Sequence, residues 1–342
     1  MAEPSDRAEI EAAWNALLTE GTGSTGWRTI PLSCPGPCRV HAGRRRPGGA
    51  EAIIVHFPTE RLPPESDLPS GRGFRTSPVP SAGGAPLGLA LWRRSAGDLG
   101  LFATMAADVV GVMRSLSMRG EDRVRQAVLS RIVAWQRFME RDGGRGLSAD
   151  EEVGLFGELV LFEALLEAGE PPGSVAAGWT GPEDALHDFE IRGGWGEVKT
   201  TLSMRGFPAR ISGLAQLDTS TRPDLVLFGV RLQETPSGRT LSDLAQSIGR
   251  RIAGDADALD VYERRLVEAG LLARDLASYG RRFGVTGTRG HRIDETFPRI
   301  VRAGVPTAVV DARYVIDLDA APAHAWTLTD AVAMLGRTTH DA

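Results

Sequence analysis

Lysine is almost absent from this chain. Of its 342 residues, 39 are Lys or Arg, and Lys199 is the only lysine among them. Arg carries a planar group that stays protonated, whereas Lys carries a compact, rotatable charge whose pKa can move. Because Arg fills every other basic position, Lys199 marks a place where Arg cannot substitute, unless its presence is chance. Catalysis is one setting with such a requirement.

Cysteine and long apolar runs are scarce as well. Cys34 and Cys38 are the only cysteines, and without a second pair they form at most half of a zinc site. We therefore interpret them as two reduced thiols. No apolar run approaches the 18 residues of a membrane span, and the first residues lack the basic and apolar regions of a signal peptide. We expect a cytoplasmic protein without a membrane partner.

Length and charge limit the number of domains and the kinds of partner that this protein can have. A chain of 342 residues with 42% hydrophobic content can form two ordinary domains, each with a core. Residues 143–146 are the best boundary because three of the four are glycine, which predicts domains over 1–146 and 147–342. The formal net charge of −5 argues mildly against a non-specific nucleic-acid coat, since phosphate neutralisation supplies most of that affinity.

Short β segments between turn clusters dominate the first hundred residues, and helices follow. This pattern predicts an N-terminal β-rich plus helical domain without a catalytic constellation. It could be a DNA-reading module, a partner-binding module or a buttress. The predicted elements are helices over 6–19, 106–116 and 122–141, strands over 27–32, 38–41 and 52–57, and a hairpin of 87–93 with 99–102.

The second half mixes strands with helices after a leading helix. That order predicts an α/β (α+β) domain in which a mixed sheet is flanked by helices. The predicted elements are strands over 209–214, 224–231 and 308–317, a hairpin of 282–285 with 291–293, and helices over 241–252, 258–272 and 329–335.

A β-hairpin with a primed turn is predicted by two alternating segments, 186–192 and 195–201, on either side of Gly193-Gly194. If these glycines form the loop, Glu190 lies opposite Glu197 and Asp188 lies opposite Lys199. The period of two then sends all four side chains to one face. Like charges set opposite one another destabilise a sheet, so this patch needs a compensating cation, and a divalent metal is the natural candidate.

Another acidic residue lies on the helix that precedes this hairpin. Residues 148–151 form a capping-box pattern, and the apolar run that follows predicts a helix of about 20 residues. Glu158 shares the face of Leu155 and Phe162, which should be buried. A carboxylate rarely lies there without a partner, so Glu158 either pairs with an Arg or contributes to the metal site.

These residues together resemble the PD-(D/E)XK nuclease superfamily, and more closely the bacterial family of PD-(D/E)XK motif proteins. Because His187 stands where the motif has Pro, the likeness departs from the pattern at a loosely kept position. The likeness extends over most of the chain. The segments that carry it are Gly-Leu-Phe-Gly-Glu-Leu at 154–159, His-Asp-Phe at 187–189, Glu-Val-Lys-Thr-Thr at 197–201, Gly-Leu-Ala-Gln-Leu-Asp at 213–218, Phe-Pro-Arg-Ile at 297–300, and 304–318.

The resemblance implies a restriction-endonuclease-like fold and metal-dependent hydrolysis of DNA that leaves a 5′ phosphate. Asp188 and Glu197 would hold Mg²⁺, or Mn²⁺ in its place, with Glu158 completing the shell. Lys199 would orient the attacking water, and Gln216 would help position the scissile phosphate unless it is an ordinary surface residue. Glu190 lies on the same predicted face and leaves room for a second ion.

The same resemblance implies a setting in bacterial restriction or phage defence, with DNA and neighbouring defence proteins as partners. Cutting both strands usually requires two copies of the site, which makes a homodimer the expected form of a double-strand cutter. Two other interpretations stay open. One is a catalytically silent DNA-binding or scaffold subunit with the same fold, and the other is a structural salt-bridge patch in an unrelated α/β protein.

Overall fold

The computed structural model describes residues 4–18, 25–58, 62–79, 88–140, 146–183, 185–220, 222–321 and 328–335. Within these ranges the chain forms eight α-helices and sheets of five, four and two strands. The prediction of a mixed α and β fold is confirmed. In the same residues, no helix combines the length and apolarity needed to cross a bilayer.

Two compact units divide the chain. Unit 1 comprises Met1–Arg145 with Leu272–Arg274, and unit 2 comprises Gly146–Leu271 with Asp275–Ala342. The prediction of separate domains over 1–146 and 147–342 stays a prediction, because compactness does not test whether either part folds alone.

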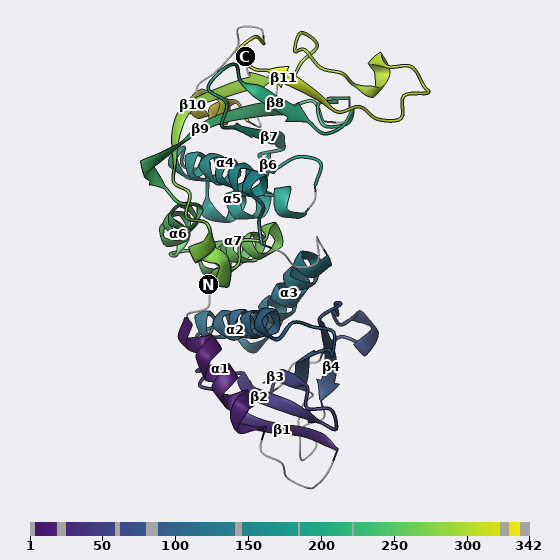
Figure 1. Cartoon of the computed structure of the whole chain (residues 1–342), viewed down its shortest axis with the longest axis vertical. Helices are drawn as coiled ribbons and strands as arrows, with labels where there is room; N and C mark the ends of the chain where they lie inside the picture. The colour runs from purple at the N-terminus through teal and green to yellow at the C-terminus, as the bar shows by residue number, and fades with distance from the viewer. Residues whose placement is uncertain are drawn as a thin grey trace. The chain divides into compact units, whose positions relative to one another are not determined.

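Unit 1 is an antiparallel sheet of five strands in the order β1-β2-β3-β5-β4 with three helices (Figure 1). Trp14 anchors the first helix to the sheet, since its indole N–H donates to the carbonyl of Ala52 over 2.7 Å and its ring stacks on Phe102. The elements are α1 (Pro4–Ala16), β1 (Gly26–Pro31), β2 (Arg39–Arg46), β3 (Glu51–His56), β4 (Phe74–Val79), β5 (Gly88–Arg93), α2 (Leu99–Ser115) and α3 (Glu121–Glu140).

One prediction for unit 1 is wrong. Residues 99–102 form the first turn of α2 and not the second strand of a hairpin. Asp98 caps this helix by accepting a hydrogen bond from the backbone N–H of Leu101 over 2.7 Å. The short apolar run after this cap is compatible with a helix as well as with a strand, and the cap decides for the helix. Leu87 of the predicted hairpin lies outside the described residues.

Unit 2 is built on a mixed sheet in the order β10-β9-β7-β6, in which β7 and β9 are parallel and the other neighbours are antiparallel. A separate ribbon pairs β8 with β11. The elements are α4 (Ala149–Glu167), α5 (Pro172–Gly178), β6 (Phe189–Ile191), β7 (Gly194–Thr201), β8 (Pro208–Ile211), β9 (Leu225–Arg239), α6 (Leu241–Ile252), α7 (Ala256–Ala269), β10 (Phe283–Arg292), β11 (Tyr314–Asp317) and α8 (Leu328–Met334).

Strand β9 carries two hydrophobic cores, one on each face. Val226 and Phe228 belong to the core shared with α4 to α7, and Leu225 and Leu227 to the core beneath the β8–β11 ribbon. Alternation sends successive side chains to opposite faces, so a strand covered on both sides has a continuous apolar sequence. Figure 1 shows helices α4 and α5 on one side of this sheet and the ribbon on the other.

Two strand predictions in unit 2 need correction. Residues 283–292 form one strand, β10, which pairs with β9 along its whole length, and Gly287 follows a register shift. The glycine pattern that suggests a hairpin turn marks this irregularity instead. The final strand is shorter than expected, because β11 begins only at Tyr314.

Candidate functional site

The hairpin that carries the acidic cluster has the predicted primed turn, displaced by one residue. Ile191 pairs with Gly194, so Arg192 and Gly193 form the loop, with φ angles of 52° and 79°. Positive φ at both positions is the signature of a type I′ turn. Arg192 tolerates this conformation while its guanidinium forms an ion pair with the buried Glu170. The expectation that Gly193 and Gly194 form the loop is therefore wrong.

Displacing the turn changes which residues pair across the hairpin, but each side chain stays on its predicted face of the sheet. Glu190 lies opposite Trp195 and not opposite Glu197, a shift of two residues along β7, which is one full strand period. Asp188 lies just before β6, so the expected pairing with Lys199 does not form. The side chain of Glu190 is exposed.

Asp188 takes the place of a strand partner for β7. Strand β6 ends its pairing at Phe189 opposite Gly196, and beyond that point the Asp188 Oδ2 atom accepts a hydrogen bond from the backbone N–H of Val198 over 2.7 Å. The carbonyl of Asp188 accepts from the backbone N–H groups of Thr180 and Gly181 at 2.8 and 3.0 Å. Both ends of this residue are therefore fixed at the open edge of β7.

Lys199 lies beside Glu197 on one face of β7. Its Nζ atom is 2.6 Å from the Glu197 Oε1 atom, and the same oxygen accepts from the Gln216 amide nitrogen at 2.6 Å. The other oxygen of Glu197 is buried and has no hydrogen-bond partner within the described structure. A buried carboxylate oxygen without a partner is costly, which makes it a candidate ligand for a cation.

Glu158 reaches the same place from α4. Its Oε2 atom accepts a hydrogen bond from the Trp179 indole N–H over 2.8 Å. A Cβ atom built on Gly181 would lie 2.9 Å from that oxygen and 3.0 Å from Asp188 Oδ1. The two carboxylates therefore face one small space, which stays open because Gly181 has no side chain.

Helix α4 approaches the strand closely enough to make this possible. Its N-terminus has the predicted capping box, because Ser148 Oγ accepts from the Glu151 backbone N–H, and the Glu151 carboxylate accepts from the Ser148 backbone N–H. Further along the same helix, a Cβ atom on Gly157 would lie only 1.9 Å from Thr200 Oγ1. Only glycine allows the backbone of α4 to lie at this distance from β7, and Glu158 is the next residue.

Electrostatics couple these side chains. Burial raises the pKa of Glu197 well above its usual value, and the neighbouring Asp188 and Glu158 raise it further against the opposing effect of Lys199. Burial likewise raises the pKa of Asp188. For Lys199 burial works in the other direction, but the nearby carboxylates of Glu197, Asp188 and Glu158 outweigh it, so the pKa of its amine is raised. Three acids around one base leave an excess of negative charge.

Behind the acidic side chains, Gln216 and His187 hold Glu197 in place. The side-chain oxygen of Gln216 accepts from the backbone N–H and hydroxyl of Ser212 at 2.9 and 3.0 Å. Its backbone carbonyl accepts from the Nε2 atom of the buried His187 at 2.8 Å. Gln216 is buried, so the alternative of an ordinary surface glutamine is wrong.

Sequence reasoning missed Trp179 and Gly181, which lie between the acidic helix and the hairpin. Trp179 forms a bridge with Phe189, which runs its segment along the start of the hairpin and brings it beside Asp188. The only sequence signal is an aromatic residue two positions before a glycine, which is too common to identify a site.

The donor set fits a hard divalent cation. Among the residues that the structure describes, no three His, Cys, Asp or Glu side chains are arranged so that they could hold a metal ion by themselves. An open site suits Mg²⁺, because this ion keeps several waters and is usually bound by one or two carboxylates together with substrate phosphates. The unpartnered Glu197 oxygen, the space beside Gly181 and the raised pKa values of two acids all agree with such a site.

Comparison with known families matches this arrangement. A family model described as "Putative PD-(D/E)XK family member, (DUF4420)" spans residues 10–319, which is most of the chain. The chain belongs to this family. No curated protein and no solved structure gives a significant match. The PD-(D/E)XK proteins are a nuclease-like superfamily that typically uses divalent metals, and the resemblance inferred from the sequence is thereby confirmed.

Proposed function

We propose that this PD-(D/E)XK protein is a metal-dependent endonuclease that hydrolyses phosphodiester bonds in DNA. The observation that carries the proposal is the meeting of Glu158, Asp188 and Glu197 with the chain's only lysine at the open edge of β7. Carboxylates that can hold a divalent ion beside an amine suit metal-assisted phosphate hydrolysis. A structural salt-bridge patch has no need of a buried carboxylate oxygen without a partner.

Asp188 and Glu197 would hold the ion, Mg²⁺ or Mn²⁺, with Glu158 as a third ligand directly or through water. A bound divalent ion supplies a Lewis acid for the phosphate oxygens and lowers the pKa of a bound water. Lys199 carries a fixed positive charge, because its pKa is raised, and this charge stabilises the negative charge that develops on the phosphate. The resemblance to nucleases of this superfamily implies a product with a 5′ phosphate.

The supporting residues have separate tasks. Gln216 fixes one oxygen of Glu197, so that the second oxygen keeps its direction. Trp179 fixes one oxygen of Glu158 in the same way. Because a misplacement of about 1 Å can cost roughly a hundredfold in rate, such positioning residues matter even when they touch no substrate. Glu190, exposed and further along the hairpin, could serve only a second, outer ion.

The test is cleavage by the purified full-length protein. Supercoiled, linear and single-stranded DNA, each methylated and unmethylated, would be incubated with Mg²⁺, Mn²⁺ or EDTA. We expect metal-dependent cleavage that is lost, by about a hundredfold or more, in Asp188→Asn, Glu158→Gln and Lys199→Ala. The matched control is Glu167→Gln, which removes an exposed acid from the same helix and should cleave normally.

Binding of DNA without cleavage under every condition would refute the enzyme and favour a scaffold subunit. A role in restriction or phage defence belongs to the same proposal, and it is tested by comparing phage plating on bacteria that carry the wild-type gene or the Lys199→Ala variant. Sedimentation of the protein with and without DNA tests the expected homodimer.

A further inference from the structure

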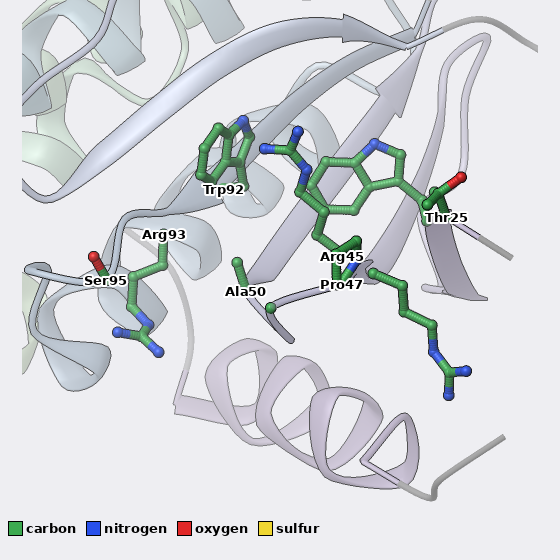
Figure 2. Close-up of a pocket in the computed structure, with 11 residues that line it drawn as sticks. Thr25, Arg45, Pro47, Ala50, Trp92, Arg93 and Ser95 are labelled. Carbon is green, nitrogen blue, oxygen red and sulfur yellow. The ribbon is translucent and has the colours of Figure 1, made fainter. Parts of the chain in front are cut away.

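Unit 1 contains a pocket of about 890 Å³ at one end of its five-stranded sheet. This volume lies within the range of about 300–1,000 Å³ that is typical of small-ligand sites. Figure 2 shows the side chains around it, with the Arg45 guanidinium beside the Trp92 ring. The lining residues are Thr25, Gly26, Trp27, Arg45, Arg46, Pro47, Gly48, Ala50, Trp92, Arg93 and Ser95.

The sheet brings two tryptophans and an arginine to the same face. Trp27 on β1 lies directly opposite Arg45 on β2. Trp92 on β5 joins them across β3, and its ring centroid is 4.8 Å from the Arg45 guanidinium carbon. Gly43, the next residue of β2 on this face, has no side chain, and a Cβ atom there would lie 3.5 Å from the Trp27 ring. The pocket thus has a flat aromatic wall.

The charge of the lining is positive. Among the described residues that line the pocket there are three arginines and no acidic side chain. Arg93 is partly neutralised by Glu51, which lies 2.7 Å away. Arg45 is exposed and makes no ion pair with any described residue. Its guanidinium lies over the Trp92 ring, so its outer N–H groups remain available for an anion. A cationic ligand, which an aromatic wall alone could accept, is excluded by this charge.

One buried donor in this wall also lacks a partner. The indole N–H of Trp92 is inaccessible to solvent and makes no hydrogen bond within the described structure. Buried indole N–H groups usually find an acceptor. Because solvent does not reach this N–H, a ligand in the pocket would contact the face of the Trp92 ring and not this donor.

We propose that this pocket binds a nucleotide, with the base stacked on the tryptophan wall and the phosphate bound by Arg45. Aromatic stacking accepts any base, and the guanidinium fork matches phosphate oxygens. The proposed nuclease would meet such a nucleotide in a DNA strand, where it is either unpaired or turned out of the duplex. The assignment of the nucleotide to DNA therefore rests on the proposed function. The pocket would make unit 1 a DNA-reading module.

The experiment is isothermal titration of the full-length protein, in EDTA so that no cleavage occurs. The probes are the four deoxynucleoside 5′-monophosphates, the corresponding deoxynucleosides, inorganic phosphate and a 12-nucleotide single strand. The variants are Arg45→Gln, which changes an exposed side chain and should fold normally, and Trp92→Ala. Arg119→Ala removes an exposed arginine of unit 1 outside the pocket and is the matched control.

We expect the monophosphates to bind at least tenfold more tightly than the deoxynucleosides or phosphate alone. Arg45→Gln and Trp92→Ala should each weaken this binding by about tenfold or more, and Arg119→Ala by less than twofold. Equal binding of phosphate alone, or unchanged binding by Arg45→Gln, would overturn the nucleotide site. Binding of free monophosphates but not of the 12-nucleotide strand would overturn the DNA source. None of these outcomes depends on whether the protein cleaves DNA.

Discussion

Gly157→Ala should separate helix α4 from strand β7 and so disturb the acidic site. The new Cβ atom would lie 1.9 Å from Thr200 Oγ1, 3.0 Å from its Cβ and 3.2 Å from its Cγ2. Since contacts of this kind cannot be relieved by one rotamer change, either the helix or the strand must move. Overpacking of a core costs about 1–3 kcal/mol, and the better helix propensity of Ala returns only about 0.5–1 kcal/mol.

The expected net loss is about 1 kcal/mol of unfolding free energy. For a unit of this size, about 2–4 °C of melting temperature corresponds to each kcal/mol, so the melting temperature should fall by about 2–4 °C. Gly154→Ala is the matched control, because nothing lies within 4 Å of a Cβ atom at that position of the same helix. It should raise the melting temperature by a few degrees.

The same pair of variants separates the effect on the site from the effect on helix propensity. Gly157→Ala should reduce cleavage by roughly tenfold to a hundredfold, because Glu158 moves with the helix. Thr200→Ala alone should change stability and cleavage little, since the Thr200 hydroxyl is buried without a hydrogen-bond partner in the described structure. Combined with Gly157→Ala, it should restore part of the cleavage rate that Gly157→Ala loses. If Gly157→Ala proved as stable and as active as Gly154→Ala, the close approach of α4 to β7 would be refuted.

Three further outcomes follow from the site. Lys199→Arg should keep the fold but lose cleavage by about a hundredfold, because a planar fork cannot take the place of a compact amine; normal cleavage would contradict the proposed role. Trp179→Phe should lower the maximal cleavage rate by about tenfold with little change in DNA affinity, as it removes the hydrogen bond to Glu158. Burial raises the pKa of Glu197, and an acid of this kind stabilises the fold most below its unfolded pKa and loses that contribution as pH rises through its folded pKa. Without divalent ions, the melting temperature should therefore fall as pH rises above about 4, and it should fall less steeply in Glu197→Gln. Mg²⁺ should offset this fall in the wild-type protein. Identical pH profiles for the wild-type protein and Glu197→Gln would show that Glu197 does not titrate this way.

The sequence predicted the chemistry of the site better than its backbone. The period of two placed Glu197 and Lys199 on one face, and the capping box located α4, because both patterns are local. The exact turn was not local: Arg192 takes a left-handed conformation while pairing with Glu170, which lies 22 positions earlier in the chain.

The errors in unit 1 and in β10 have different origins. A short apolar run suits a helix or a strand, and only the cap at Asp98 decides for α2. Gly287 suits a turn or a bulge, and only the length of the partner strand β9 decides for a continuous β10. For β10 the deciding information is tertiary, whereas the cap at Asp98 is a local signal of the same kind as the capping box of α4.

The scarcity of lysine gives the site an intrinsic reporter. When the protein is produced with isotope-labelled lysine, the labelled nitrogen signals of every molecule come from Lys199 alone. The Lys199 Nζ atom lies 2.6 Å from a carboxylate oxygen of Glu197, so its chemical shift should change when ions or DNA bind. A single resonance would thus follow the state of this protein's acidic cluster in solution, with no engineered label.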